Sequence, residues 1–231
     1  MNTIQALAII PARGGSKRLP QKNLRFLGGI PLVEHTLKAA SESRCFTKII
    51  LSSDDLDILA LASRFPGIEP AMRSPELSGD HVTVLTLVNA ILEQPGIATL
   101  YNAVAVMLPT APFRNAHHVK EAFRHLTPSV DGVVSLAPLS YPPQISVRME
   151  GNSIRPLFVP SPLYTGNTRS QDQEPTYRPN GGIYIQWLEK FRINKNFWKG
   201  NISGFIMSED ESIDIDTQRD LDYANFLMAR L

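Results

Sequence analysis

The stretch that decides the fold is residues 6–23, ALAIIPARGGSKRLPQKN, in which an apolar run ends at Pro11. Gly14-Gly15, a serine hydroxyl and a cluster of cations follow at once. An apolar run that a proline interrupts is typical of a buried strand. Paired glycines let backbone N–H groups turn toward an anion, and Arg and Lys neutralise its charge. The sequence therefore predicts a strand ending in a polyphosphate-binding loop, with a basic surface turn as the alternative.

The glycine spacing in this loop matches neither G-x-x-x-x-G-K-[ST] nor G-x-G-x-x-G, so neither a P-loop ATPase nor an ordinary dinucleotide fold is indicated. Two acidic residues, Asp54 and Asp55, follow the next predicted strand. Aspartate at the start of a helix usually caps it, so helix capping is the favoured role of this pair. The residues expected to hold the phosphates are Arg13, Gly14, Ser16, Lys17, Lys22 and Asn23.

The chain has 231 residues, of which 43% are hydrophobic, enough for one domain with a sizeable core. Lys and Arg total 23 against 22 for Asp and Glu, so the balance indicates no nucleic-acid or membrane partner, and any anion site must be local. The single cysteine, Cys45, cannot form an internal disulfide. Neither a membrane-length apolar run nor a signal-peptide pattern is evident, so we expect a soluble, cytoplasmic protein.

Apolar runs alternate with helical patterns, which predicts an α/β fold with a mainly parallel sheet sandwiched by helices over residues 1–231. Strands are expected at residues 6–11, 48–52, near 68–71, 103–108, 131–137, 182–186 and 202–207. Helices are expected at residues 31–42, 55–64, 82–93, 116–126 and 217–229. Dense prolines between residues 138 and 179 disfavour long helices, and polar alternation there predicts a small hairpin-like excursion over 138–175. A floppy surface loop is the alternative for that segment.

Two carboxylates near the C-terminus, Asp214 and Asp216, alternate with isoleucines in a strand-like segment. Alternation places both on the same side, where they repel each other and favour a cation between them. Oxygen ligands beside a phosphate indicate Mg²⁺. Capping of the last helix is the alternative role of Asp216.

The loop Ile-Pro-Ala-Arg-Gly-Gly-Ser-Lys-Arg-Leu-Pro-Gln-Lys-Asn resembles the N-terminal signature of the acylneuraminate cytidylyltransferases, the CMP-sialic acid synthetases. Members couple CTP to a nine-carbon 2-keto sugar acid and release pyrophosphate. The resemblance extends from residue 6 to about 225, through four separated motifs in the expected order. It implies a Rossmann-like fold of the nucleotide-diphospho-sugar transferase type. It also implies a homodimer, in which the excursion 138–175 is the dimerisation element and reaches toward the partner's active site.

On the nucleotide side, the resemblance implies that the loop residues above bind CTP and that Arg73 lies against the cytosine ring. Without it, Arg73 and Asp80 could equally be a loop ion pair and a helix cap. The family also uses the Asp-x-Asp motif as its metal site, which assigns Mg²⁺ to Asp214 and Asp216. The expected catalytic residues are Arg13, Lys22, Asp214 and Asp216.

On the sugar side, the family usually carries Gln where Leu108 stands, which leaves the identity of the sugar open. N-acetylneuraminate, legionaminate, pseudaminate and the deaminated nonulosonate all remain candidates. Eight-carbon octulosonate enzymes share the fold, but the motif Arg-Pro-Asn-Gly-Gly-Ile-Tyr is unlike theirs. A catalytically inactive nucleotide-sugar binder is the alternative of another class. The resemblance assigns sugar binding to Arg169, Asn180, Tyr184, Phe197 and Trp198.

Overall fold

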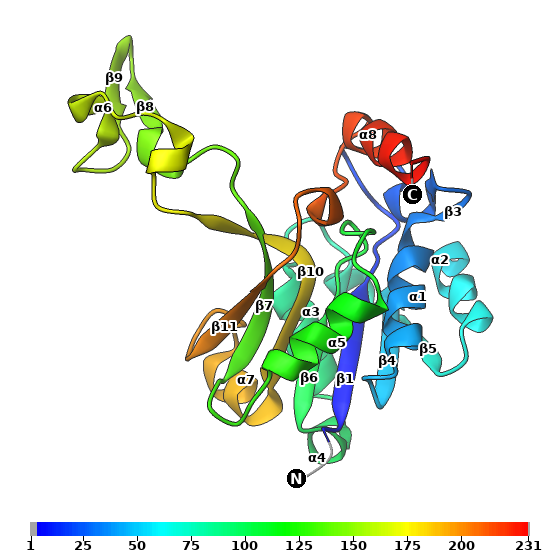
Figure 1. Cartoon of the computed structure of the whole chain (residues 1–231). Helices are drawn as coiled ribbons and strands as arrows, with labels where there is room; N and C mark the ends of the chain where they lie inside the picture. Colours follow the sequence, from blue (N-terminus) through cyan, green and yellow to red (C-terminus); the bar gives the residue numbers. More distant parts are fainter. Residues whose placement is uncertain (1–3, 231) are drawn as a thin grey trace.

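A seven-stranded sheet forms the centre of this computed structural model, which describes residues 4–230 (Figure 1). The strands lie in the order β11-β7-β10-β6-β1-β4-β5, and only β10 runs antiparallel to its neighbours. The predicted mainly parallel α/β fold is therefore confirmed. The strands are β1 (Ala6–Pro11), β4 (Lys48–Ser53), β5 (Ile68–Met72), β6 (Ala103–Val106), β7 (Gly132–Pro138), β10 (Tyr177–Trp187) and β11 (Ile202–Ile206).

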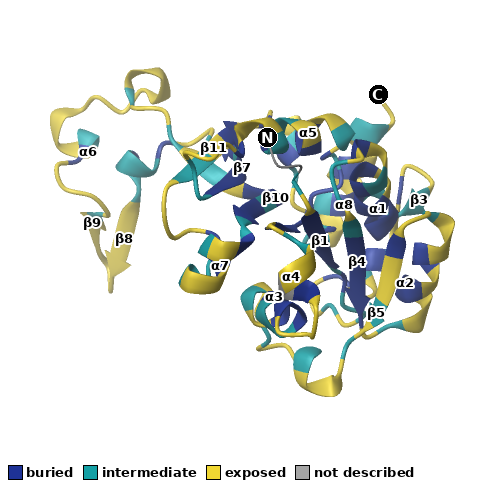
Figure 2. Cartoon of the chain, turned by 90° about the horizontal axis from the view of Figure 1, so that it is seen from below, coloured by how far each residue is buried: buried dark blue, intermediate teal, exposed yellow. Residues whose placement is uncertain are grey.

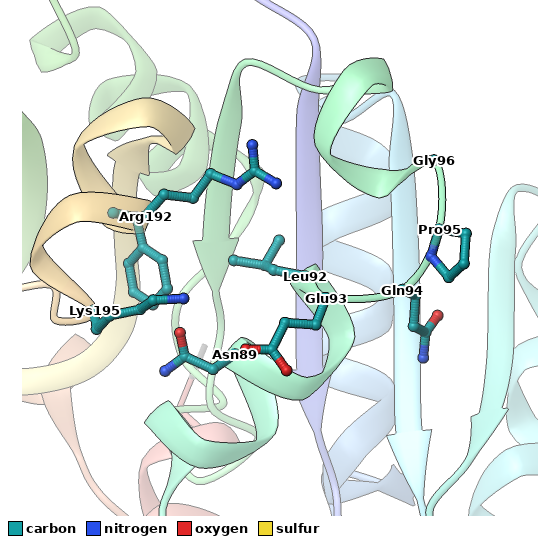
Figure 3. Close-up of a pocket in the computed structure, with 9 residues that line it drawn as sticks. Asn89, Leu92, Glu93, Gln94, Pro95, Gly96, Arg192 and Lys195 are labelled. Carbon is teal, nitrogen blue, oxygen red and sulfur yellow. The ribbon is translucent and has the colours of Figure 1, made fainter.

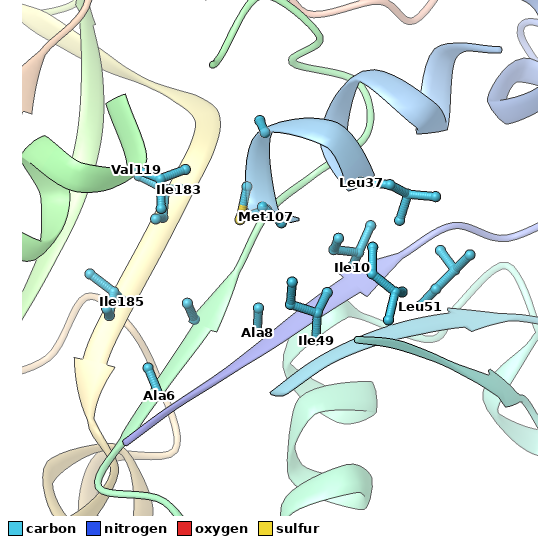
Figure 4. Close-up of a cluster of buried hydrophobic side chains, with 14 of the residues drawn as sticks. Ala6, Ala8, Ile10, Leu37, Ile49, Leu51, Met107, Val119, Ile183 and Ile185 are labelled. Atoms are coloured by element: carbon cyan, nitrogen blue, oxygen red, sulfur yellow. The ribbon is translucent and has the colours of Figure 1, made fainter. Parts of the chain in front are cut away.

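Helices cover both faces of this sheet (Figures 1 and 2). On one face, Ile10 of β1 belongs to a core cluster with Leu37 and Val119 from the helices above it (Figure 4). On the other face, Ile9 packs in a cluster with Phe191. Burial of both faces explains why β1 is a continuous apolar run and not an alternating one. The covering helices are α1 (Leu32–Ser43) and α5 (Ala116–His125) on the first face, and α3 (Val84–Leu92), α4 (Ile97–Leu100) and α7 (Leu188–Asn194) on the second.

Several element boundaries differ from the prediction. The helix expected at 55–64 divides into α2 (Leu56–Ala60) and the 3₁₀ turn η2 (Leu61–Arg64). The strand expected at 182–186 is only the second half of β10, whose register shifts between Pro179 and Tyr184. Gly181 lies in that shift with φ +73°, a conformation that glycine adopts without strain. Within residues 4–230, no helix is long and apolar enough to cross a bilayer.

The excursion is an arm, residues 139–176, that leaves the sheet after β7 and returns through β10 (Figure 1). Its strands β8 (Val147–Glu150) and β9 (Ser153–Pro156) form the predicted hairpin, and α6 (Pro162–Thr165) follows. Most of the arm is exposed (Figure 2), including Val159 at 82% and Tyr164 at 72%. A single copy of the chain therefore leaves an apolar surface of the arm uncovered.

The chain ends in α8 (Gln218–Met228), which packs beside the small hairpin of β2 (Phe26–Leu27) and β3 (Ile30–Pro31). Thr217 caps α8, and it exchanges hydrogen bonds with Asp220 in a capping box. Asp216 donates its backbone N–H to the Asp220 carboxylate and is not the cap residue, which leaves its own carboxylate available. The Asp216 carboxylate pairs with Lys22, and this pair joins the segment before α8 to the loop after β1.

Candidate active site

Two hydrogen bonds hold the predicted phosphate loop after β1 in place. Asn23 donates from its buried amide to the carbonyl of Arg13 at 2.8 Å, and Gly14 donates its N–H to Asp54 Oδ1 at 2.8 Å. A Cβ at Gly14 would lie 2.8 Å from Asp55 Cβ, so this close approach requires glycine. Asp55 is the cap of α2, accepting two backbone N–H bonds at 2.8 and 3.2 Å. Capping is thus confirmed for Asp55, whereas Asp54 supports the loop.

Two cations of the loop converge on one carboxylate, Asp80. Arg13 Nη1 lies 2.8 Å from Asp80 Oδ1, and Lys17 Nζ lies 2.7 Å from Oδ2. Lys17 and then Arg13 hold the pKa of Asp80 below its usual value. Ser16 lies on the same loop, next to Lys17. A carboxylate therefore lies between two cations, so the loop has the geometry of an anion site.

Beside this loop lies a pocket of about 280 Å³ at the carboxyl ends of the strands. Arg73 forms part of its wall and is fixed there, because Nε and Nη2 donate to the hydroxyl and the carbonyl of Ser52 at 3.1 and 2.9 Å. Burial lowers the pKa of Arg73 from its usual value. Ligands of open α/β sheets bind at this edge. The pocket is lined by Pro11, Arg13, Lys22, Asn23, Arg73, Asp80, Val82, Thr83, Val84, Leu87, Leu108, Pro109 and Thr110.

Asp214 and Asp216 flank the fully buried Ile215 in a segment that pairs with no strand of the described chain. Desolvation raises the pKa of Asp214, and the charge of Asp216 adds to this effect. Desolvation would also raise the pKa of Asp216, but Lys22 and Arg18 outweigh it and lower that pKa. Lys22 Nζ and Arg18 Nη2 lie 2.8 and 2.6 Å from the two oxygens of Asp216. The two carboxylates therefore lie beside the phosphate loop but differ electrostatically.

Tyr184 lies against two other predicted sugar residues and is close enough to Asp214 to feel its charge. Its ring centroid lies 6.0 Å from that of Phe197 and 5.9 Å from that of Trp198. Burial and then the charge of Asp214 raise the pKa of the Tyr184 hydroxyl. Phe197 is only 5% exposed and is a core residue, whereas Trp198 is 50% exposed and can contact a ligand. The structure thus brings three of the five predicted sugar residues together.

The other two predicted sugar residues lie elsewhere. Asn180 is 2% exposed, and its amide donates to Ser212 Oγ at 2.8 Å and accepts from Ser135 Oγ at 2.6 Å. We predicted that Asn180 faces the sugar pocket, but the structure places it in the interior, where it joins β10 to the segment that precedes Asp214. Arg169 belongs to the arm, residues 139–176, and the arm projects away from the sheet of its own chain (Figure 1).

Thr110 is a site residue that the sequence analysis missed. Its carbonyl accepts the N–H of Ile215 at 2.8 Å, and its side chain counteracts the rise in the pKa of Asp214. The sequence does carry a signal for Thr110. The residue lies in a Pro-Thr-Ala-Pro turn directly after β6, and residues that contact ligands follow strand ends in this fold class. Arg18, the second partner of Asp216, was likewise visible as a loop cation.

A second pocket, of about 360 Å³, lies between the end of α3 and α7 (Figure 3). Asn89, Arg192 and Lys195 line it. None of the predicted site residues is among its lining residues, so it is separate from the candidate active site.

Comparisons with known proteins place these features in a family. A family model described as cytidylyltransferase matches residues 7–141. A CMP-N,N'-diacetyllegionaminic acid synthase of Legionella pneumophila is 34% identical, over 94% of this chain and 93% of its own. A pseudaminic acid cytidylyltransferase of Campylobacter jejuni is 32% identical, over 96% and 95%. An N-acylneuraminate cytidylyltransferase of Streptococcus agalactiae is 34% identical over 94% of this chain, which spans 52% of that relative's length.

Solved structures share the fold. A CMP:2-keto-3-deoxy-manno-octonic acid synthetase complexed with CTP superposes with a TM-score of 0.67 at 18% identity, covering 98% of this chain and 99% of its own. A 4-diphosphocytidyl-2C-methyl-D-erythritol synthase of Anaerococcus prevotii gives 0.65 at 16% identity, covering 99% and 100%. The family model and the three relatives together show that this chain belongs to the cytidylyltransferase family.

Proposed function

We propose that the protein couples CTP to the anomeric hydroxyl of a nonulosonic acid, a nine-carbon 2-keto-3-deoxy sugar acid, and releases pyrophosphate. The observation that carries this proposal is the contact between Lys22 and Asp216, which joins a phosphate loop to a carboxylate pair. The activities for which the Legionella, Campylobacter and Streptococcus relatives are named support the same reaction. The proposed location is the cytoplasm, where CTP is made.

The nucleotide occupies the 280 Å³ pocket in this proposal. Arg73 selects the cytosine by hydrogen bonding and stacking, and its contacts with Ser52 already fix its position. Arg13, Lys17 and Lys22 hold the triphosphate, replacing their present carboxylate contacts with phosphate contacts.

Asp214 and Asp216 fit Mg²⁺ as part of its oxygen shell. Mg²⁺ is usually bound through one or two carboxylates and completes its octahedral shell with substrate phosphates and water. Among residues 4–230, no group of three or more His, Cys, Asp or Glu side chains converges, so in this proposal the substrate phosphates and water would supply the remaining ligands. When bound, Mg²⁺ neutralises charge on the phosphate oxygens and lowers the pKa of the attacking hydroxyl.

Transfer of the cytidylyl group is an in-line displacement. The anomeric hydroxyl oxygen forms a bond to the α-phosphorus, and the α–β bridging oxygen leaves with its electron pair as part of pyrophosphate. The hydroxyl proton is released to solvent. Arg13, Lys17 and Lys22 position the triphosphate and stabilise the charge that develops on the leaving group.

The sugar lies against Tyr184 and Trp198 in this proposal, next to Asp214. Leu108 lines the 280 Å³ nucleotide pocket and stands where sialate enzymes usually carry a Gln that touches the sugar, so one polar contact to the sugar is replaced by an apolar one. N-acetylneuraminate, legionaminate and pseudaminate all remain candidates. Relatives named for diacetyllegionaminate, N-acylneuraminate and pseudaminate are 32–34% identical to this chain.

A homodimer completes the sugar site in this proposal. The arm carries exposed apolar side chains such as Val159 and Tyr164, which a second copy would cover. Arg169 lies on the same arm, and its guanidinium can bind the sugar carboxylate bidentately in the partner's site.

The test is incubation with CTP, Mg²⁺ and a panel of nonulosonic acids, with pyrophosphate release as the signal. Release with one sugar supports transfer and names the acceptor. CTP binding without release for any sugar in the panel favours the alternative of a nucleotide-sugar binder. Absence of CTP binding would contradict the assignment of the loop after β1.

A further inference from the structure

Arg114 is a fully buried cation. Among the described residues, no acidic side chain forms an ion pair with it. It is 1% exposed, and burial alone lowers its pKa to about 9, so it still carries its charge at neutral pH. Its Nη1 atom is buried and has no hydrogen-bond partner within residues 4–230. A buried charge without a counterion destabilises a fold, so ordinary packing does not explain a guanidinium here.

The guanidinium instead connects three separate elements. Nε donates to the carbonyl of Gly182 in β10 at 2.9 Å, and Nη2 donates to Thr36 Oγ1 of α1 at 2.7 Å and to the carbonyl of Leu108 at 3.3 Å. Leu108 also donates its own N–H to Gly181 at 3.2 Å. Arg114 therefore fastens the turn after β6 to β10 and to α1.

That turn carries Thr110, which holds the segment of the carboxylate pair in two ways. The Thr110 carbonyl accepts from the Ile215 N–H at 2.8 Å, and the Thr110 side chain lies close enough to Asp214 to counteract the rise in the pKa of that carboxyl. Displacement of the turn would displace both contacts. The position of Asp214 thus depends on a guanidinium that has no contact with Asp214 itself.

We propose that Arg114 is a positioning residue for the carboxylate pair: it holds the turn of residues 108–114 so that Thr110 keeps Asp214 oriented for a divalent cation. This inference rests on the proposed function, because it gives Asp214 a role in the metal-assisted step. Groups that orient metal ligands typically contribute about tenfold to a hundredfold to metal affinity or activity.

The experiment compares Arg114→Met, which removes all donors, with Arg114→Lys, which keeps the charge but cannot reach all three acceptors. Mn²⁺ affinity in the presence of CTP is measured by paramagnetic resonance, alongside kcat, the KM of each substrate and the melting temperature. We expect Arg114→Met to weaken Mn²⁺ binding and to lower kcat by about tenfold or more, with CTP affinity measured without metal almost unchanged. Arg114→Lys should lie between this variant and the wild type.

Two controls distinguish positioning from general destabilisation. Glu34→Gln removes another buried charge, on α1, and should leave Mn²⁺ affinity unchanged. Thr110→Val should weaken Mn²⁺ binding by itself, and adding Arg114→Met to it should have little further effect, because both act through one turn. If Arg114→Met does not fold, Arg114→Lys and its combination with Thr110→Val provide the comparison.

Lower melting temperature with unchanged Mn²⁺ affinity, or effects of Arg114 and Thr110 that combine independently, would overturn the inference. A wild-type protein that binds Mn²⁺ with CTP but releases no pyrophosphate would contradict the proposed function alone, and Mn²⁺ affinity would still decide the role of Arg114. A wild-type protein that binds no Mn²⁺ would overturn both.

Discussion

Lys22 donates from Nζ to Asp216 Oδ1 at 2.8 Å, across a sequence separation of 194 residues. This contact brings the segment before the last helix against the loop after the first strand. Because Lys22 is 13% exposed and Asp216 is 29% exposed, the pair is only partly screened by solvent. Asp214 forms no ion pair with a cation of residues 4–230, and desolvation keeps its pKa raised.

Neutralising Asp216 should destabilise the protein, whereas neutralising Asp214 should not. Asp216→Asn removes the pairing with Lys22 and Arg18 and should cost about 1 kcal/mol of the free energy of unfolding at pH 7. Asp214→Asn removes a desolvated charge that repels Asp216 and should leave the melting temperature unchanged or raise it. Thermal unfolding at pH 7 tests both, and an equal loss in the two variants would contradict the distinction.

The same variants should respond differently to acid. Asp216 has a lowered folded pKa, so its stabilisation is complete above the unfolded value of about 3.9 and disappears as pH falls through the folded value. Asp214 has a raised folded pKa, so its ionised form destabilises the protein above that value, and this cost disappears as pH falls through it. Any advantage of Asp214→Asn at pH 7 should therefore vanish near pH 4 in unfolding curves.

Asp80→Asn should strengthen CTP binding. The substitution removes the negative charge that occupies Arg13 and Lys17 in the free protein, and because exposed pairs of this kind are weak, CTP affinity should rise by no more than about fivefold. Calorimetric titration with CTP gives the comparison. Glu76→Gln is the matched control, because it removes an exposed charge from the same loop region. Weaker binding in Asp80→Asn would mean that Asp80 organises the loop instead of competing with the phosphate.

Trp198→Ala and Phe197→Ala should separate ligand binding from packing. Trp198 is half exposed beside Tyr184, so its loss should raise the KM for the sugar by about tenfold and change the melting temperature little. Phe197 is buried against Phe191, with centroids 4.6 Å apart, so its loss should cost about 3–5 kcal/mol of stability. Steady-state kinetics and thermal unfolding distinguish the two, and an unchanged sugar KM in Trp198→Ala would remove that residue from the sugar site.

Val159→Asp in the arm should dissociate the proposed homodimer, because it places a charge in the surface that a second copy would cover. Light scattering after size exclusion measures the mass. Ile193→Asp is the control, since Ile193 is 78% exposed on α7 and lies outside the arm. A wild-type protein that is already monomeric, or a Val159→Asp variant that remains dimeric, would exclude the arm as the interface.

Local signals in the sequence predicted β1 and the loop after it well. The buried strand begins and ends at residues 6 and 11 as expected, because burial on both faces makes its whole run apolar. The loop cations could be predicted because glycines and charged residues directly follow the end of this strand. These features depend on neighbouring residues alone.

Features that depend on distant partners were not predictable. Asn180 was interpreted as a pocket residue because an amide in a strand gives no sign of its partners, Ser135 and Ser212, on two other elements. The antiparallel course of β10 and the role of Thr110 are likewise consequences of chain packing. The sequence gives no sign that the cation Arg114 is buried, and only the structure shows it.

The pairing of the loop cations with Asp80 and Asp216 has a consequence for how a nucleotide arrives. Four loop cations share these two carboxylates, so the loop keeps an excess of positive charge although the whole chain carries a formal net charge of only +1. Attraction of the anionic nucleotide therefore comes from the loop itself and not from the field of the whole protein. Its reach is about one Debye length, roughly 10 Å at 0.1 M salt, so only nucleotides already near the loop are guided into it.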